Sequence, residues 1–116
     1  MNVEEIRNYC IAKPNVTESF PFDNDTLVFK VVDKMFLLMS LEKQPVSINA
    51  KCNPDKAIQL REQFPNHIFP GYHMNKIHWN TVVVDEFLGW QMVKELIDSS
   101  YELVVKSLPK SKQLLL

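Results

Sequence analysis

The chain has 116 residues, the usual length of one domain, which is enough to bury a core without disulfides or a structural metal. Hydrophobic residues make up 46% of it, and 2 glycines against 7 prolines exclude collagen-like and glycine-rich linker classes. A formal net charge of −1 excludes a strongly basic nucleic-acid coat and a long acidic tail.

The first predicted element is a helix over residues 2–12. Asn2 and Glu5 have the spacing of a capping box, and apolar residues then recur on one helical face. Pro14 ends the helix, because a proline disfavours helical geometry in the residue before it. Residues 14–25 are rich in proline, asparagine and aspartate, which predicts a loop. Two aromatic residues are expected to anchor this loop to the core: Phe20 and Phe22.

Alternation with a period of two predicts three consecutive antiparallel strands between residues 26 and 51. The first two strands, over 26–31 and 35–41, are separated by Asp33-Lys34, which predicts a tight hairpin. The third strand, over 46–51, alternates apolar residues with Ser47, Asn49 and Lys51. One face of the sheet is therefore expected to be apolar and the other at least partly open to solvent.

The second half of the chain adds a helix, strands and a longer helix. Asn53-Pro54 predicts a helix start, since asparagine caps and proline suits the first turn, and this helix continues to about Gln63. A short strand is possible near residues 68–69, and a β-branched run predicts a strand over 81–84. The last helix begins near Leu88 or Gly89, and Pro109 ends it.

The order of these elements predicts an α+β fold, a two-layer α/β sandwich with an antiparallel sheet and helices on one face. We expect a single domain over residues 1–109 and a frayed C-terminal tail over 110–116.

The cysteines and the hydropathy of the chain limit the cellular compartments and the kinds of chemistry to be expected. Cys10 and Cys52 fall at core-facing positions without a paired motif, so we expect two buried thiols. The longest apolar run covers residues 35–39, far below the ~20 residues of a membrane-spanning helix, and no secretory signal opens the chain. We therefore expect a cytoplasmic protein that does not enter membranes. We also expect no metal or cofactor, because His73 and His78 are five residues apart instead of the four of a metal-binding helix, and no enzyme, because both cysteines face inward.

Residues 63–84 contain the strongest functional signal. All three histidines of the chain lie here, and the wider stretch 43–84 carries a local charge of +3 against −4 for the remainder. Interleaved rings and cations are typical of surfaces that stack bases or follow a nucleic-acid backbone. The candidate nucleic-acid contacts are Tyr72, His73, Asn75, Lys76, His78 and Trp79, with Asn49 and Lys51 on the polar face of the third strand.

Two interpretations of this stretch stay open. Pro70-Gly71 predicts a type II turn with positive φ at the glycine, which would present the following residues on a structured loop. Alternatively, Tyr72 and Trp79 anchor the loop to the core, and the histidines only cap backbone groups. The exposure of residues 72–79 decides between them.

Five stretches in chain order carry a family resemblance over nearly the whole chain. They read PNVTESFPF (14–22), TLVFKV (26–31), INAKCNP (48–54), PGYHMNKIHWNTV (70–82), and LIDSSY followed by VVKSLP (96–109). Together they resemble the MmcQ/YjbR family of small bacterial proteins. Ile77 departs from the pattern, because family members often carry a second lysine there.

The resemblance implies a fold of order α-β(3)-α-β(2)-α, similar to CyaY (frataxin-like) proteins and secretion chaperones, and it makes the region near Ile68 a strand. It also implies the family's label, a predicted "double wing" DNA-binding protein. We therefore expect a non-enzymatic DNA-binding or DNA-associated accessory protein with weak, salt-dependent binding. The alternative is a protein-interaction module, chaperone-like, with a protein partner or a homodimer, for which the apolar tail Leu114–Leu116 would serve.

Overall fold

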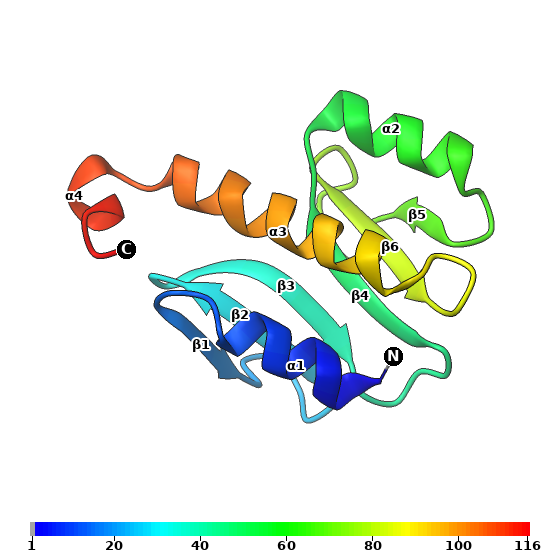
Figure 1. Cartoon of the computed structure of the whole chain (residues 1–116), viewed down its shortest axis with the longest axis horizontal. Helices are drawn as coiled ribbons and strands as arrows, with labels where there is room; N and C mark the ends of the chain where they lie inside the picture. Colours follow the sequence, from blue (N-terminus) through cyan, green and yellow to red (C-terminus); the bar gives the residue numbers. More distant parts are fainter. Residues whose placement is uncertain (1) are drawn as a thin grey trace.

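The structure is a computed structural model that describes residues 2–116, and it consists of one antiparallel sheet with helices on one face (Figure 1). The strand order across the sheet is β1-β2-β3-β4-β6-β5. This confirms the predicted α+β class. The helices are α1 (Val3–Ile11), α2 (Pro54–Gln63), α3 (Trp90–Ser107) and α4 (Lys110–Gln113). The strands are β1 (Val16–Ser19), β2 (Thr26–Val31), β3 (Lys34–Ser40), β4 (Val46–Lys51), β5 (Ile68–Pro70) and β6 (Trp79–Val84).

Strand β1 lies inside the stretch that the sequence predicts to be a loop, and that prediction was wrong there. It pairs with β2 along one edge of the sheet. Pro14 and Pro21 flank this strand, and prolines in a sequence usually indicate a loop. An edge strand tolerates nearby prolines, so they did not prevent β1 from forming. The loop after β1 is not anchored in the core either, since Phe20 is 46% and Phe22 65% exposed.

Two further boundaries differ from the sequence prediction. The β2–β3 hairpin turns at Val32 and Asp33, which both have positive φ, as a type I′ turn requires. The tail, expected to be frayed, carries helix α4, and the side-chain amide of Asn15 donates a hydrogen bond to the carbonyl of Leu115.

The main core lies between the sheet and the helices. Phe29 and Phe36 of the sheet are fully buried there, beside Ile97 of α3. Cys10 and Cys52 are buried free thiols, as predicted. Burial raises the pKa of Cys10 to about 12 and also raises the pKa of Cys52, so both thiols are neutral at physiological pH.

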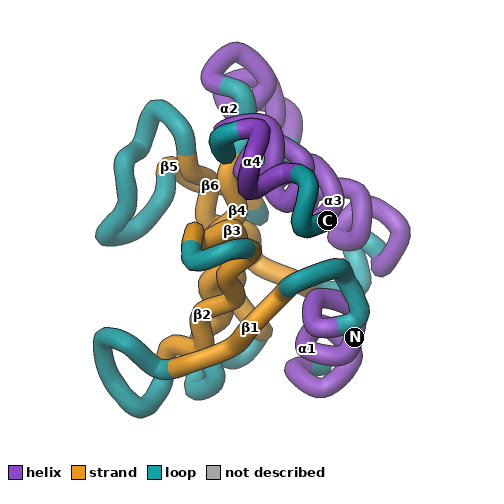
Figure 2. The backbone as a smooth tube through the Cα atoms, turned by 90° about the vertical axis from the view of Figure 1, so that its left-hand side faces the viewer, coloured by secondary structure: helices purple, strands orange, loops and turns teal. Residues whose placement is uncertain are grey.

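The opposite, helix-free face of the sheet is only partly covered. Figure 2 shows the helices on one side of the sheet and two loops projecting on the other, the β1–β2 loop and the β5–β6 loop. A small apolar cluster of Val28, Leu38 and Trp79 lies on this face, with Met35 and Met74 packed against it. The remainder of the face between the two loops is more polar.

Within residues 2–116, no helix combines the length and the apolar character needed to cross a membrane.

Candidate functional site

A cleft of about 510 Å³ lies on the helix-free face. The β1–β2 loop and the β5–β6 loop, which project on this side of the sheet (Figure 2), both contribute to its lining. Its floor carries the hydroxyl and amide groups of strand residues beside the apolar Leu38, because alternate residues of the central strands point away from the main core. We call it the inter-loop cleft. It is lined by Phe22 and Asp23 from one loop, Tyr72, His73 and Met74 from the other, Lys43 from the β3–β4 connection, and Thr26, Leu38, Ser40, Ser47, Asn49 and Thr81 from the sheet.

The β5–β6 loop is held in shape by its own hydrogen bonds. The Asn75 side-chain oxygen accepts from the backbone N–H groups of Ile77 and His78, at 2.9 and 3.3 Å. The Lys76 ammonium donates to the carbonyl of Gly71 at 3.1 Å. Asn75 and Lys76, two predicted contacts, therefore serve first to close the loop on itself.

Arg61 of α2 ties the base of this loop to the helical layer. Its Nε donates to the side-chain oxygen of the buried Asn80 at 2.7 Å, and its Nη2 donates to the carbonyls of Lys76 and Trp79. Arg7, the other arginine of the chain, forms an ion pair with Glu18 at 2.7 Å. Both arginines are thus engaged within the protein.

Gly71 is needed for space and not for its backbone dihedral, which corrects the predicted type II turn. Among the described residues, Gly89 is the glycine with positive φ, whereas the left-handed residue of this loop is His73, with φ 59°. A Cβ atom at Gly71 would lie 2.8 Å from the Cβ of Trp79 and 2.9 Å from its carbonyl oxygen. The glycine lets the two arms of the loop approach closely.

Tyr72 is an exposed ring of the inter-loop cleft, as is Phe22 on the opposite loop. Tyr72 is 60% exposed, its ring centroid lies 4.0 Å from that of His73, and the Lys43 ammonium lies 5.1 Å from its centroid. The Tyr72 backbone N–H donates to the Thr81 hydroxyl at 2.8 Å, and that hydroxyl donates to the Asn49 side-chain oxygen. Within residues 2–116 no acceptor takes the Asn49 side-chain N–H groups, so they remain available in the cleft.

The charges around the cleft are unevenly placed. Backbone N–H groups of Asp25 and Thr26 donate to Asp23 at 2.9 and 2.6 Å, and they hold the pKa of this carboxyl below its usual range. Nearby, a hydrogen bond with Asp25 raises the pKa of Glu42. The acidic groups belong to the β1–β2 side, whereas the Lys43 ammonium lies at the Tyr72 wall.

The inter-loop cleft brings together three of the predicted residues: Asn49, Tyr72 and His73. Trp79 is 8% exposed and packs on Val28 and Leu38, so it is a core residue and not an accessible stacking surface. The core interpretation of residues 72–79 therefore holds for Trp79 and not for Tyr72, which is 60% exposed. Lys51 and His78 lie outside this cleft.

The sequence interpretation missed Lys43, Thr81 and the β1–β2 loop as parts of the cleft. Thr81 could have been inferred from strand register, because it lies directly opposite Asn49 on β4 and must share its face. Nothing in the local pattern places Lys43 or Phe22 beside Tyr72, since these residues come from three distant segments. Among the described residues, no group of three or more His, Cys, Asp or Glu side chains could hold a metal ion.

The sequence comparisons cover nearly the full chain. The YjbR family model matches residues 11–103. The Escherichia coli K12 protein YjbR is 34% identical over 116 residues, which cover 100% of this chain and 98% of that protein. The protein YbdF of Escherichia coli O157:H7 is 36% identical over 110 residues, 95% of this chain and 89% of that protein.

Solved structures show the same fold. The Deinococcus radiodurans protein DR2400, described as a DUF419 domain, is similar with a TM-score of 0.92 and 38% identity, covering 98% of this chain and 87% of that chain. A crystal structure from Pseudomonas syringae is similar with a TM-score of 0.75 and 28% identity, covering 89% of this chain and 98% of that chain. With its sequence and its fold in agreement, the chain belongs to the YjbR family.

Proposed function

We propose that this chain is a non-enzymatic DNA-binding or DNA-associated accessory protein, and that its inter-loop cleft takes a single DNA strand. The observation that carries the proposal is the exposed Tyr72 ring, with the Lys43 ammonium beside it and a floor of hydroxyl and amide groups below. A planar ring stacks on bases, while lysine and side-chain amides contact phosphate and sugar.

Neither arginine is free to contact DNA bases, and this favours a single strand over a duplex as the ligand. Arginine is the commonest reader of guanine in the major groove. Arg7 and Arg61 are both engaged inside the protein, in the ion pair with Glu18 and in the contacts that hold the β5–β6 loop. Unpaired bases need no such reader, because they can stack on exposed rings such as Tyr72 and Phe22.

We propose a non-enzymatic role because no activated nucleophile lies in the inter-loop cleft among residues 2–116. Both thiols are buried with raised pKa values, so neither supplies a thiolate at neutral pH. His67, which has a carboxylate partner in Asp85 at 2.7 Å, lies outside the inter-loop cleft.

The test is fluorescence anisotropy with a labelled single-stranded oligonucleotide and its duplex. We expect the single strand to bind more tightly. If two or three phosphates are contacted, raising the salt from about 50 to about 200 mM weakens binding about ten-fold. Tyr72→Ala removes a base stack worth roughly 1–3 kcal/mol and weakens binding at least about five-fold. Phe87→Ala, which removes an exposed ring outside the cleft, is the matched control and should leave binding unchanged.

Glu42→Gln tests whether the partner is a polyanion. This carboxyl lies beside Asp25, next to the acidic wall of the cleft, so its neutralisation should strengthen binding of a polyanion. The proposal is refuted if neither oligonucleotide binds at low salt, or if Tyr72→Ala and Phe87→Ala behave alike.

The protein-interaction alternative is supported by the apolar C-terminal tail. Leu114 is 87% and Leu115 64% exposed, although Leu115 is held near Asn15. Sedimentation would favour this alternative if it shows a dimer that Leu114→Ser and Leu115→Ser together dissociate, while neither change affects DNA binding.

A further inference from the structure

A second cleft lies on the opposite face of the sheet, between α2 and α3. It has a volume of about 230 Å³. Its floor is formed by Ala50, Ile68 and Val82, and leucines from the two helices form its walls. We call it the interhelix cleft.

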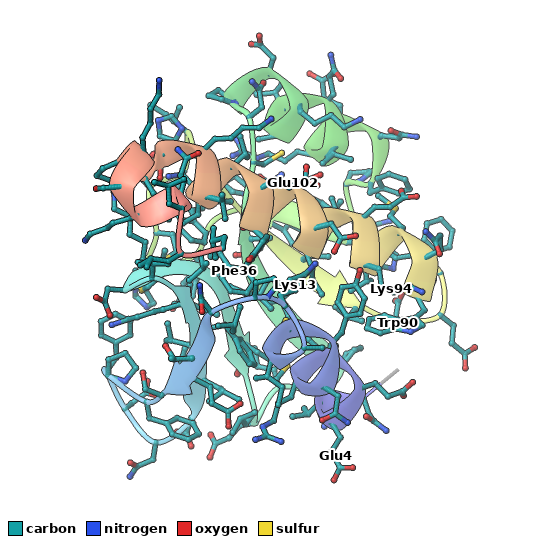
Figure 3. All side chains as sticks on the ribbon, turned by 60° about the vertical axis from the view of Figure 1, so that its left-hand side comes forward. Glu4, Lys13, Phe36, Trp90, Lys94 and Glu102 are labelled. Carbon is teal, nitrogen blue, oxygen red and sulfur yellow. The ribbon has the colours of Figure 1, made fainter. Side chains whose placement is uncertain are left out.

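Three lysines surround this apolar space. Lys51 at the end of β4, Lys56 on α2 and Lys106 on α3 all line the interhelix cleft. Within residues 2–116, none of these ammonium groups forms an ion pair or a side-chain hydrogen bond. The acid that lines the cleft is Glu102, which Figure 3 shows on the side of α3 that faces α2. The three lysines therefore outweigh the single carboxylate at this rim.

Two further residues that line the cleft, Cys52 and Asn80, offer neither a reactive thiolate nor a free hydrogen-bonding group. Cys52 reaches the cleft, but its thiol is neutral, because burial raises its pKa more than Lys56 and Arg61 lower it. Asn80 also lines the cleft, yet its oxygen accepts from Arg61 and its amide donates to the carbonyl of Ala57. The floor thus offers apolar contact, and the rim offers positive charge.

We propose that the interhelix cleft binds a small amphipathic anion, an aliphatic carboxylate of about six to eight carbons, whose chain lies on the apolar floor and whose head contacts the lysine rim. Ligand sites commonly combine an apolar lining with a few placed polar groups. The small volume limits the ligand to a short chain. This site is independent of the function proposed for the inter-loop cleft, because the two clefts lie on opposite faces of the sheet.

The test is a titration of the ¹⁵N-labelled full chain with sodium octanoate, followed by amide chemical shifts. We expect shifts that cluster at residues 51–53 and 96–103, with a Kd of about 1 mM or tighter, as expected for a ligand of about ten non-hydrogen atoms. Octylamine, which has the same chain and the opposite charge, should not shift these amides. Acetate, which has the head group without the chain, should not either.

Variants separate the lysine rim from the apolar floor. Lys56→Gln with Lys106→Gln should weaken octanoate binding about five-fold, while Lys112→Gln, an exposed lysine outside the cleft, should not. Ser99→Phe places a ring into the cleft from an exposed helix position and should abolish the shifts without lowering the melting temperature.

The proposal is overturned by any of three results. One is that octanoate causes no shifts at several times the expected Kd. Another is that octylamine shifts the same amides equally. The third is that Ser99→Phe, folded as judged by circular dichroism, binds octanoate like the wild type.

Discussion

Gly71 and Trp79 show how a single position depends on a residue that is distant in sequence. The Pro-Gly pair correctly indicates a turn, but it gives the wrong reason for the glycine. The reason is the backbone of Trp79, which accepts a hydrogen bond from the Gly71 N–H at 2.9 Å and leaves no room for a Cβ atom. Trp79 in turn covers Val28 and Leu38 on the helix-free face.

Gly71→Ala should therefore destabilise the protein by about 1–3 kcal/mol through overpacking against Trp79, as measured by urea denaturation. Gly89→Ala is an informative comparison. No atom lies within 4 Å of a Cβ there, but φ is +79° and ψ 152°, a conformation that essentially only glycine adopts, so the cost of about 1–3 kcal/mol is entirely conformational. Replacing Gly71 by serine would be at least as damaging as alanine, whereas a Gly71→Ala protein with wild-type stability would show that the loop relaxes freely.

At the scale of elements, Ser100 connects α3 to two strands at once. Its hydroxyl donates to the carbonyl of Phe36 on β3 and accepts from the backbone N–H of Lys51 at 2.8 Å. Ser100 is fully buried, so water cannot replace either partner. This side chain therefore links the helix by hydrogen bonds to two neighbouring strands of the sheet.

Ser100→Ala should lower the free energy of unfolding by about 1–3 kcal/mol, because it leaves the buried Phe36 carbonyl and the part-buried Lys51 N–H without their partner. Ser99→Ala, at the exposed neighbouring position, should change stability by no more than about 0.5 kcal/mol. Thermal unfolding of the two variants side by side measures the difference, and equal melting temperatures would contradict the role given to Ser100.

The elements that the sequence predicted well are those whose signals are local. Asn2 caps α1 by accepting from the Glu5 N–H at 2.9 Å, and Asn53 caps α2 by accepting from the N–H groups of Asp55 and Lys56. Strand β1 was missed because its pairing with β2 is not visible in four residues between prolines. The inter-loop cleft was predicted only in part for the same reason. Tyr72 and Asn49 lie in recognisable sequence patterns, whereas Lys43 comes close to them only when the chain is folded.

At the scale of the whole molecule, a polar cluster holds α1 against α3. The Asp98 carboxylate accepts from the Tyr9 hydroxyl at 2.7 Å and from the Lys13 ammonium. Figure 3 shows Lys13, Lys94 and Trp90 gathered between these two helices. Burial opposes ionisation of Asp98, but the hydrogen bonds from Lys13 and Tyr9 outweigh it and hold the pKa of Asp98 below its ordinary value.

Stability should therefore depend on pH through Asp98. A lowered folded pKa means that the contribution is present above the unfolded pKa of about 4 and is lost as the pH falls through the folded value. Asp98→Asn should cost about 1 kcal/mol near neutral pH, and its stability should converge with that of the wild type in acid. Denaturation curves between pH 7 and pH 2.5 test this, with Glu62→Gln as the control carboxyl-to-amide change. A constant gap across that range would refute it.

The two edges of the sheet determine how the protein meets copies of itself. An edge strand offers unpaired backbone groups to a neighbouring chain, and long, flat edges invite fibre growth. Here one edge is β1, with four residues between prolines, and the other is β5, with three residues ending at Pro70, which has no N–H to donate. A second copy therefore finds too little backbone to extend the sheet, so crowding should produce contacts between side chains and not cross-β assemblies.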